Sequence, residues 1–126
     1  MTRETIRPDG VAVPAAPYSS VVASGDLVVT SGQVPFDVER NLVSDAFDDQ
    51  ARQTFENLGR CLEAAGCGFA DVLKVNAYLA DLADFEAFNR IYAEFFSEPY
   101  PARTTVGAQL LGFRVEVDAI ARRPSS

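Results

Sequence analysis

A fixed positive charge beside two hydroxyl groups is the first feature of this sequence that could do chemistry. Residues 101–107, PARTTVG, place Arg103 directly before Thr104 and Thr105, at what reads as the start of a strand. A guanidinium is always charged, and its planar fork can hold both oxygens of a carboxylate. The stretch therefore predicts either a carboxylate-binding site or an ordinary surface arginine, and both interpretations stay open at this level.

Two acidic side chains form a second candidate group. Glu116 and Asp118 alternate with Val115 and Val117 in the sequence RVEVDAIA. Successive side chains of a strand point to opposite faces of its sheet. We therefore expect both carboxylates on one face of one strand, opposite the apolar residues.

The residues that are absent narrow the chemistry further. There is no histidine, which excludes Ser-His-Asp and Cys-His nucleophile systems and any metal site that needs imidazole. Cys61 and Cys67 are too few for a zinc cage or a disulfide framework, so we expect two reduced, partly buried thiols. We expect no bound metal and no cofactor.

Length and charge indicate one soluble domain over residues 1–126. The chain has 48% apolar and 23% charged residues and a net charge of −7. The basic residues form no stripe, which argues against nucleic acid as a main partner. No apolar run is long enough to span a bilayer, and the polar N-terminus has no signal-peptide core, so we expect a cytoplasmic protein without a membrane partner.

The hydrophobic periodicity predicts an α+β fold. Two helices cover one face of a mixed β-sheet of about six strands. The other face also carries apolar residues that no remaining helix can cover, which predicts an oligomer. The predicted elements are a hairpin at 18–31, helices at 46–65 and 84–96, and strands at 71–79, 103–109 and 113–121.

Two of these elements carry informative side-chain patterns. The alternation in 71–79 assigns Leu73 to the same face as Val75, Ala77 and Leu79. The helix at 84–96 has an aromatic stripe formed by Phe85, Phe88, Tyr92 and Phe95. Asn89 lies inside this stripe, where a buried amide must find hydrogen-bond partners. It either bonds to neighbouring backbone or points into a site at the edge of the helix.

Motifs in order along nearly the whole chain, from Pro17 to Arg122, resemble those of the RidA (YjgF) family of imine/enamine deaminases. The resemblance implies a fold like that of bacterial chorismate mutase, and a homotrimer with three clefts between subunits. The motifs are APYS at 16–19, SGQVP at 31–35, QARQTFENLGRCLEAAG at 50–66, DVLKVNAYLADLADFEAFNRIYAEFF at 71–96, PARTTVG at 101–107 and VEVDAIA at 115–121.

The resemblance also implies a set of site residues. Arg103 matches the arginine that binds the substrate carboxylate in deaminating members. Thr105 stands where many members have a cysteine, and Asp118 matches a glutamate thought to orient the attacking water. Glu116 matches another family glutamate, which we interpret as a solvated or inter-subunit acid. The remaining implied substrate-binding residues are Tyr18, Ser31, Gly32 and Asn89.

The activity implied by the resemblance is hydrolysis of 2-enamino or 2-imino acids, of the 2-aminoacrylate and 2-iminobutyrate type, to 2-keto acids and ammonia. Arg103 would hold the carboxylate, and Asp118 would accept a hydrogen bond from the attacking water. Two alternatives stay open. The protein could be a non-catalytic member that binds a small carboxylate or keto acid, or a specialised catabolic deaminase with a larger substrate.

Overall fold

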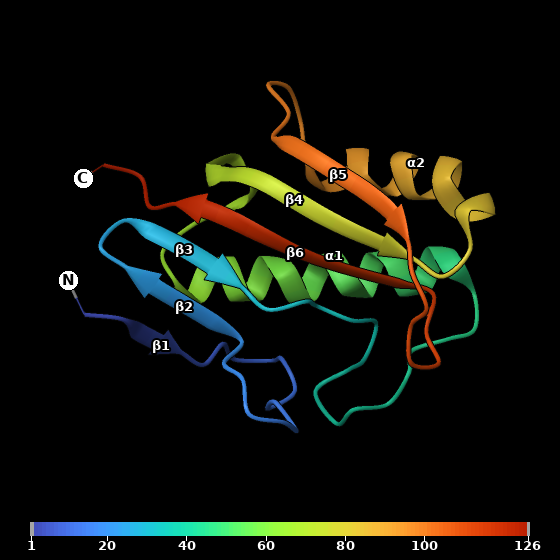
Figure 1. The fold of residues 1–126 in the computed structure, drawn as a ribbon, viewed down its shortest axis with the longest axis horizontal. Coiled ribbons are helices and arrows are strands. Elements are labelled where there is room, and N and C mark those ends of the chain that lie inside the picture. The colour runs from blue at the N-terminus through green and yellow to red at the C-terminus, as the bar shows by residue number, and fades with distance from the viewer. Residues whose placement is uncertain (1, 126) are drawn as a thin grey trace.

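The computed structural model describes residues 2–125, and its core element is one six-stranded sheet with the order β1-β2-β3-β6-β4-β5. β4 and β5 run parallel, and all other neighbouring strands are antiparallel. This mixed sheet confirms the predicted fold class (Figure 1). The strands are β1 (Glu4–Ile6), β2 (Val21–Ser24), β3 (Leu27–Thr30), β4 (Val72–Leu79), β5 (Ala102–Gly107) and β6 (Val115–Arg122).

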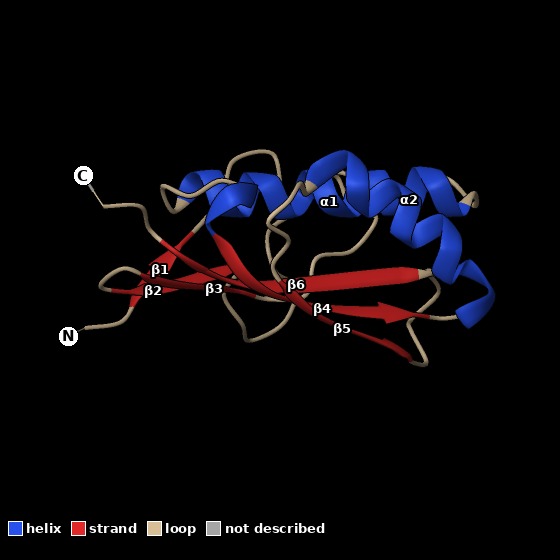
Figure 2. Cartoon of the chain, turned by 90° about the horizontal axis from the view of Figure 1, so that it is seen from above, coloured by secondary structure: helices blue, strands red, loops and turns tan. Residues whose placement is uncertain are grey.

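Two α-helices, α1 (Phe47–Ala64) and α2 (Phe85–Phe95), lie together on one face of the sheet (Figure 2). Short 3-10 turns, η1 (Phe69–Asp71) and η2 (Leu82–Asp84), precede β4 and α2. The predicted apolar stripe of α1 is fully buried against the sheet and α2. No helix in the described part of the chain combines the length and the apolar character that crossing a membrane requires.

The start of β4 corrects the predicted strand pattern. A β-bulge between Val72 and Lys74 shifts the alternation, so that Val72 is buried and Leu73 is 54% exposed. Leu73 therefore does not share the core face of Val75. The bulge arises from the pairing of β4 with β6, which the sequence of β4 alone does not reveal.

The aromatic stripe of α2 also differs from its prediction at one end. Phe85, at the first residue of the helix, is 41% exposed. Ile91, which the predicted stripe did not include, is fully buried beside Phe88. Phe55 of α1 packs between the two helices, with its ring centroid 5.6 Å from that of Phe88. The buried residues of α2 are therefore Phe88, Ile91 and Tyr92.

β1 was not among the predicted strands. Its three residues pair with β2 at the edge of the sheet, and they are mostly exposed. A strand this short and polar carries little periodic signal. Its addition completes a sheet of six strands.

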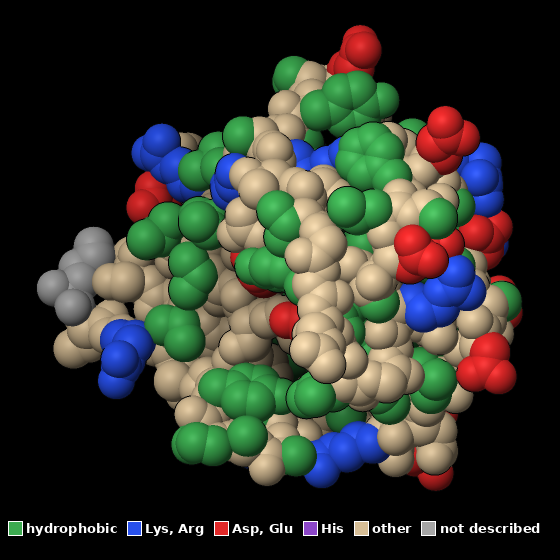
Figure 3. Space-filling view, turned by 45° about the vertical axis from the view of Figure 1, so that its right-hand side comes forward, with side chains coloured by type: hydrophobic (Ala, Val, Ile, Leu, Met, Phe, Trp, Pro, Cys, Tyr) green, Lys and Arg blue, Asp and Glu red, His purple; other side chains and the backbone are tan. Residues whose placement is uncertain are grey.

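The face of the sheet opposite the helices is uncovered in the single chain. Ile120 of β6 and Val29 of β3 are paired there, and both are only partly buried. Hydrophobic side chains gather on this side around a hollow in which acidic surface shows (Figure 3). An uncovered apolar sheet face is the feature on which the oligomer prediction rested, and the homotrimer itself stays a prediction.

Candidate functional site

Arg103 faces the helical layer from the edge strand β5. It pairs with Val75 of β4, a residue of the core face, so its side chain runs under α2. Its Nη2 donates a hydrogen bond to Oδ1 of Asn89, at 2.6 Å. Its guanidinium carbon lies 4.6 Å from the ring centroid of Tyr92 and 5.3 Å from that of Phe88. These contacts fix the direction of the cation without neutralising it.

No carboxylate in residues 2–125 forms an ion pair with Arg103. A cavity of about 280 Å³ opens beside the guanidinium, between α2 and the start of β5. A cation that is oriented, unpaired and next to an open volume can bind an anion. The cavity is lined by Asn89, Tyr92, Ala93, Tyr100, Pro101 and Arg103.

Two buried hydroxyl groups near Arg103 have no hydrogen-bond partner. The first belongs to Tyr92, which is 6% exposed, and the second belongs to Thr105 on the same face of β5. Burial raises the pKa of the Tyr92 hydroxyl, and the charge of Arg103 partly opposes this shift. Buried polar groups without partners are uncommon, and they favour a polar ligand at the site.

Asp118 lies on the opposite face of the sheet. It pairs with Asn76 of β4, whereas the neighbouring residues Val75 and Ala119 pair on the core face. Because successive side chains alternate, the Asp118 side chain points away from the helices. Its Oδ1 accepts a hydrogen bond from Nδ2 of Asn76 at 2.9 Å, and its Oδ2 accepts one from the Tyr78 hydroxyl at 3.2 Å. Both oxygens therefore have partners from β4, which hold the carboxylate in place.

Glu116 shares this face, and the sequence was interpreted as making it a solvated or inter-subunit acid. Its half-buried carboxylate lies against Gly32, so close that a Cβ atom at residue 32 would overlap Oε2. Burial raises the pKa of Glu116, and the negative charge of Asp118 raises it further. The sequence feature that could have indicated this contact is the glycine of SGQVP together with an acidic residue on a later strand. Their contact, however, depends on how the 31–35 segment crosses β6.

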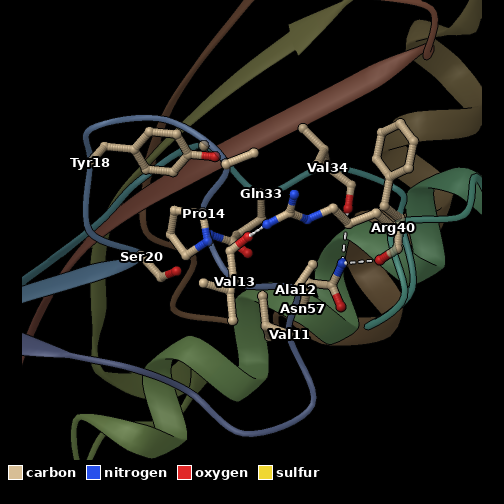
Figure 4. A pocket seen from close by; sticks show the side chains of 13 residues that line it. Val11, Ala12, Val13, Pro14, Tyr18, Ser20, Gln33, Val34, Arg40 and Asn57 are labelled. Carbon is tan, nitrogen blue, oxygen red and sulfur yellow. Dashed lines mark hydrogen bonds between the residues drawn. The ribbon is translucent and has the colours of Figure 1, made fainter.

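Gly32, which contacts this carboxylate, and Tyr18 line a cavity of about 220 Å³ (Figure 4). Tyr18 is 54% exposed and comes from the loop before β2. Ser31 is used differently, because its hydroxyl donates to the Ser19 carbonyl at 2.5 Å and so holds that loop to the end of β3. Of these three predicted substrate-binding residues, two line a cavity and the third has a structural contact.

The predicted site residues therefore form two groups that one chain does not bring together. Arg103, Asn89 and Thr105 belong to the helix side of the sheet edge. Asp118 belongs to the open face, together with Gly32. The alternation of side chains along β4 explains this separation. Arg103 pairs with Val75, whereas Asp118 pairs with the next residue, Asn76, so the two side chains point to opposite faces of the sheet. In the described residues, no group of three or more potential metal-ligating side chains forms.

The fold and the two groups define a small α+β protein in which an arginine without an ion pair among residues 2–125 lies beside a cavity at a sheet edge. The chain belongs to the Endoribonuclease L-PSP family, which it matches over residues 10–123 and which is the RidA (YjgF) family indicated by the motifs.

Two of the relatives are named as imine deaminases. The chain is 41% identical over 110 residues to a 2-iminobutanoate/2-iminopropanoate deaminase of Dermatophagoides farinae, covering 85% of this chain and 86% of the relative. It is 36% identical over 125 residues to the protein of the same name from Salmonella typhimurium, covering 95% and 98%.

Solved structures agree closely with this fold. RidA from an Antarctic Psychrobacter species has a TM-score of 0.89 and 39% identity, with coverage of 94% of this chain and 98% of that one. TdcF of E. coli with bound serine has a TM-score of 0.89 and 32% identity, with coverage of 96% and 99%.

Proposed function

We propose that this protein hydrolyses reactive 2-imino acids, and the 2-enamino acids that tautomerise to them, to 2-keto acids and ammonia. The observation that carries the proposal is the state of Arg103. Asn89 and the aromatic rings of α2 hold its guanidinium beside a cavity, and no carboxylate in residues 2–125 pairs with it. The names of the deaminase relatives support the same reaction.

The reaction depends mainly on how the substrate and the attacking water are positioned relative to each other. A water oxygen bonds to the imine carbon while the C=N π electrons move to nitrogen, which takes up a proton. The C–N bond of the resulting carbinolamine then breaks, ammonia leaves, and loss of the hydroxyl proton forms the keto group. Arg103 would hold the substrate carboxylate, so that the imine carbon meets a water already in place.

We propose that one carboxylate of β6 orients the attacking water and that the other transfers protons. Asp118, with both oxygens engaged by Asn76 and Tyr78, would orient the water as a fixed acceptor. Glu116 would exchange protons, because its raised pKa brings its titration closer to neutral pH. The contact with Gly32 would keep the Glu116 carboxylate at the cavity wall.

The separation of Arg103 from these acids supports a site shared between copies of the chain. Arg103 lies at the outer strand of the sheet, whereas Glu116 and Asp118 lie on the uncovered face. We propose that the uncovered face of one copy receives the β5 edge of the next. In a closed homotrimer this contact would repeat three times and would also bury the apolar sheet face.

The test combines two inactive variants. A flavin amino-acid oxidase generates 2-iminobutyrate in situ, and semicarbazide traps the imine that the protein leaves. Wild type should lower the trapped imine, while Arg103→Ala and Glu116→Gln should each behave like buffer. When equal amounts of the two variants are unfolded together and refolded, random assembly should restore about one site in four.

Each result has a separate meaning. Restored activity supports both the reaction and the shared site. Active wild type with no restoration rules out a site that joins Arg103 of one copy to Glu116 of another. A wild type that leaves the trapped imine unchanged rules out this hydrolysis.

A non-catalytic role in binding a small carboxylate is the second candidate. The observation that favours it is the solved relative TdcF, whose structure holds bound serine. The same Arg103 cavity would bind such a ligand through its carboxylate. Binding of 2-oxobutyrate or serine by a wild type that does not hydrolyse imines, measured by calorimetry, would support this role.

A further inference from the structure

Arg40 adopts a backbone conformation that long side chains rarely use. Its φ is +66°, and no other non-glycine residue among 2–125 has a positive φ. An arginine gains nothing from this left-handed region, which glycine or asparagine would occupy more easily. The turn at 37–41 places residue 40 in this region, because the Arg40 N–H bonds the Asp37 carbonyl and the Asp37 N–H bonds the Asn41 carbonyl. The functional question is therefore what the side chain contacts.

The exposed side chain of Arg40 reaches across to the N-terminal segment. Its Nη2 donates a hydrogen bond to the carbonyl of Val13, and the guanidinium lies at the wall of the cavity that Tyr18 and Gly32 also line (Figure 4). One hydrogen bond uses one of the five N–H groups of a guanidinium. The others are available to a ligand in the cavity.

Arg40 has no carboxylate partner in the part of the chain that the structure describes. Five other arginines do, whereas Arg3, Arg7 and Arg60 form no ion pair among residues 2–125. The arginines with such partners are Arg52, Arg90, Arg114, Arg122 and Arg123. Arg40 thus resembles Arg103, because each is an unpaired cation beside an open cavity.

The charge around this cavity is unusual for so acidic a protein. A second cavity of about 200 Å³ adjoins it and shares Tyr18 and Pro14, and Arg7 lines that second volume. No described aspartate or glutamate lines either cavity. In a chain of net charge −7, two arginines and no acid around neighbouring cavities favour a negatively charged ligand.

The cavity and the proposed reaction site meet at Gly32. Glu116 lies against Gly32, and Gly32 lines the cavity. We propose that Arg40 binds a second anionic group, at the end of the substrate side chain, so that the preferred substrates are 2-imino acids with an acidic side chain. This inference rests on the proposed function, in which Arg103 of another copy holds the first carboxylate.

The experiment compares an acidic and a neutral substrate. A flavin amino-acid oxidase generates 2-iminoglutarate or 2-iminopentanoate, and semicarbazide reports the surviving imine. The measured quantity is the ratio of kcat/KM for the acidic imine to that for the neutral imine. Arg40→Gly suits the backbone conformation of residue 40, and it should lower this ratio about tenfold or more, the loss expected for a charge-assisted hydrogen bond.

Arg60→Ala is the matched control. Arg60 also bonds a backbone carbonyl of the N-terminal segment, that of Gly10 at 2.7 Å, but it does not line the cavity. The control therefore removes the same charge and a similar contact with the N-terminal segment. Its ratio should equal that of wild type.

A binding measurement separates failure of this inference from failure of the proposed function. Calorimetry compares the binding of 2-oxoglutarate with that of 2-oxopentanoate to wild type and to Arg40→Gly. If wild type hydrolyses neither imine, the proposed function is wrong, and preferential 2-oxoglutarate binding that Arg40→Gly abolishes still supports the anionic subsite. Equal ratios or equal binding in wild type and Arg40→Gly, or the same loss in Arg60→Ala, overturn the subsite.

Discussion

Replacing Arg103 by lysine tests whether the shape of the cation matters as well as its charge. Asn89 occupies one N–H of the guanidinium, which leaves four for a ligand. Two parallel bonds to a carboxylate are therefore possible without disturbing Asn89. Lysine keeps the charge but not the planar fork.

The expected loss follows from the bonds that lysine cannot make. One charge-assisted hydrogen bond contributes about 1.5–3 kcal/mol, so losing one of the two should lower kcat/KM by roughly tenfold to a hundredfold. The aromatic stacking adds little to this difference, because an ammonium can also lie over the Tyr92 ring. The change should lie mainly in KM, since the carboxylate is held in both ground and transition states.

The assay is the semicarbazide competition with 2-iminobutyrate, run beside a matched substitution. Arg90→Lys changes a surface arginine of the same helix layer that pairs with Asp48 at 2.8 Å, and it should be silent. Thermal unfolding of each variant checks that the fold is intact. A folded Arg103→Lys protein with wild-type kcat/KM would refute the bidentate reasoning, and a fall in kcat alone would contradict a binding role.

Glu116→Gln should make the protein more stable at pH 7 than wild type but not at pH 4, as measured by urea unfolding. The folded-state pKa of Glu116 is raised above 4.5, so ionisation of its carboxylate destabilises the folded state. This loss of stability appears as the pH rises from the unfolded-state pKa through the folded-state pKa. An unchanged pH dependence of the unfolding free energy would contradict the burial argument. Asp118→Asn should lower kcat and leave partial activity, because an amide oxygen still accepts a hydrogen bond from water, and full activity would exclude Asp118 from the reaction. Gly32→Ala should push the Glu116 carboxylate aside and lower kcat by about tenfold or more, with only a small loss of thermal stability. A kcat equal to that of wild type would show that the position of this carboxylate is unimportant. In the native protein Cys61 should not react with a disulfide reagent at pH 8, because the thiol is fully buried and burial raises its pKa to about 12. Rapid labelling of Cys61 before denaturation would show that the core opens readily.

Local patterns in the sequence were sufficient to predict the helices and most strands. The apolar stripe of α1 and the alternation of β6 are short-range signals, so their elements could be predicted within a few residues of their observed ends. The special character of Arg103 was visible in its motif, and the structure adds that Asn89 and the rings of α2 orient it. Of the two alternatives left open for Asn89, the structure shows a bond to the Arg103 side chain, and its role in binding substrate stays a prediction.

The errors occur where distant segments meet. Leu73 was assigned to the core because the bulge in β4 depends on its pairing with β6. Phe85 was assigned to the buried stripe, but the packing of α2 on α1 decides which side of the helix is covered. A periodicity rule sees one element at a time, whereas burial depends on which two elements touch.

The sequence by itself determined which residues could do chemistry: one arginine at the start of a strand, two acids on one strand face, and no histidine. Only the tertiary structure decided that Arg103 and Asp118 lie on opposite faces, that Glu116 rests on Gly32, and that Arg40 lines a cavity. The physical reason is that strand register and loop paths set side-chain directions across the sheet. These depend on pairing between segments far apart in the chain, which no local pattern records.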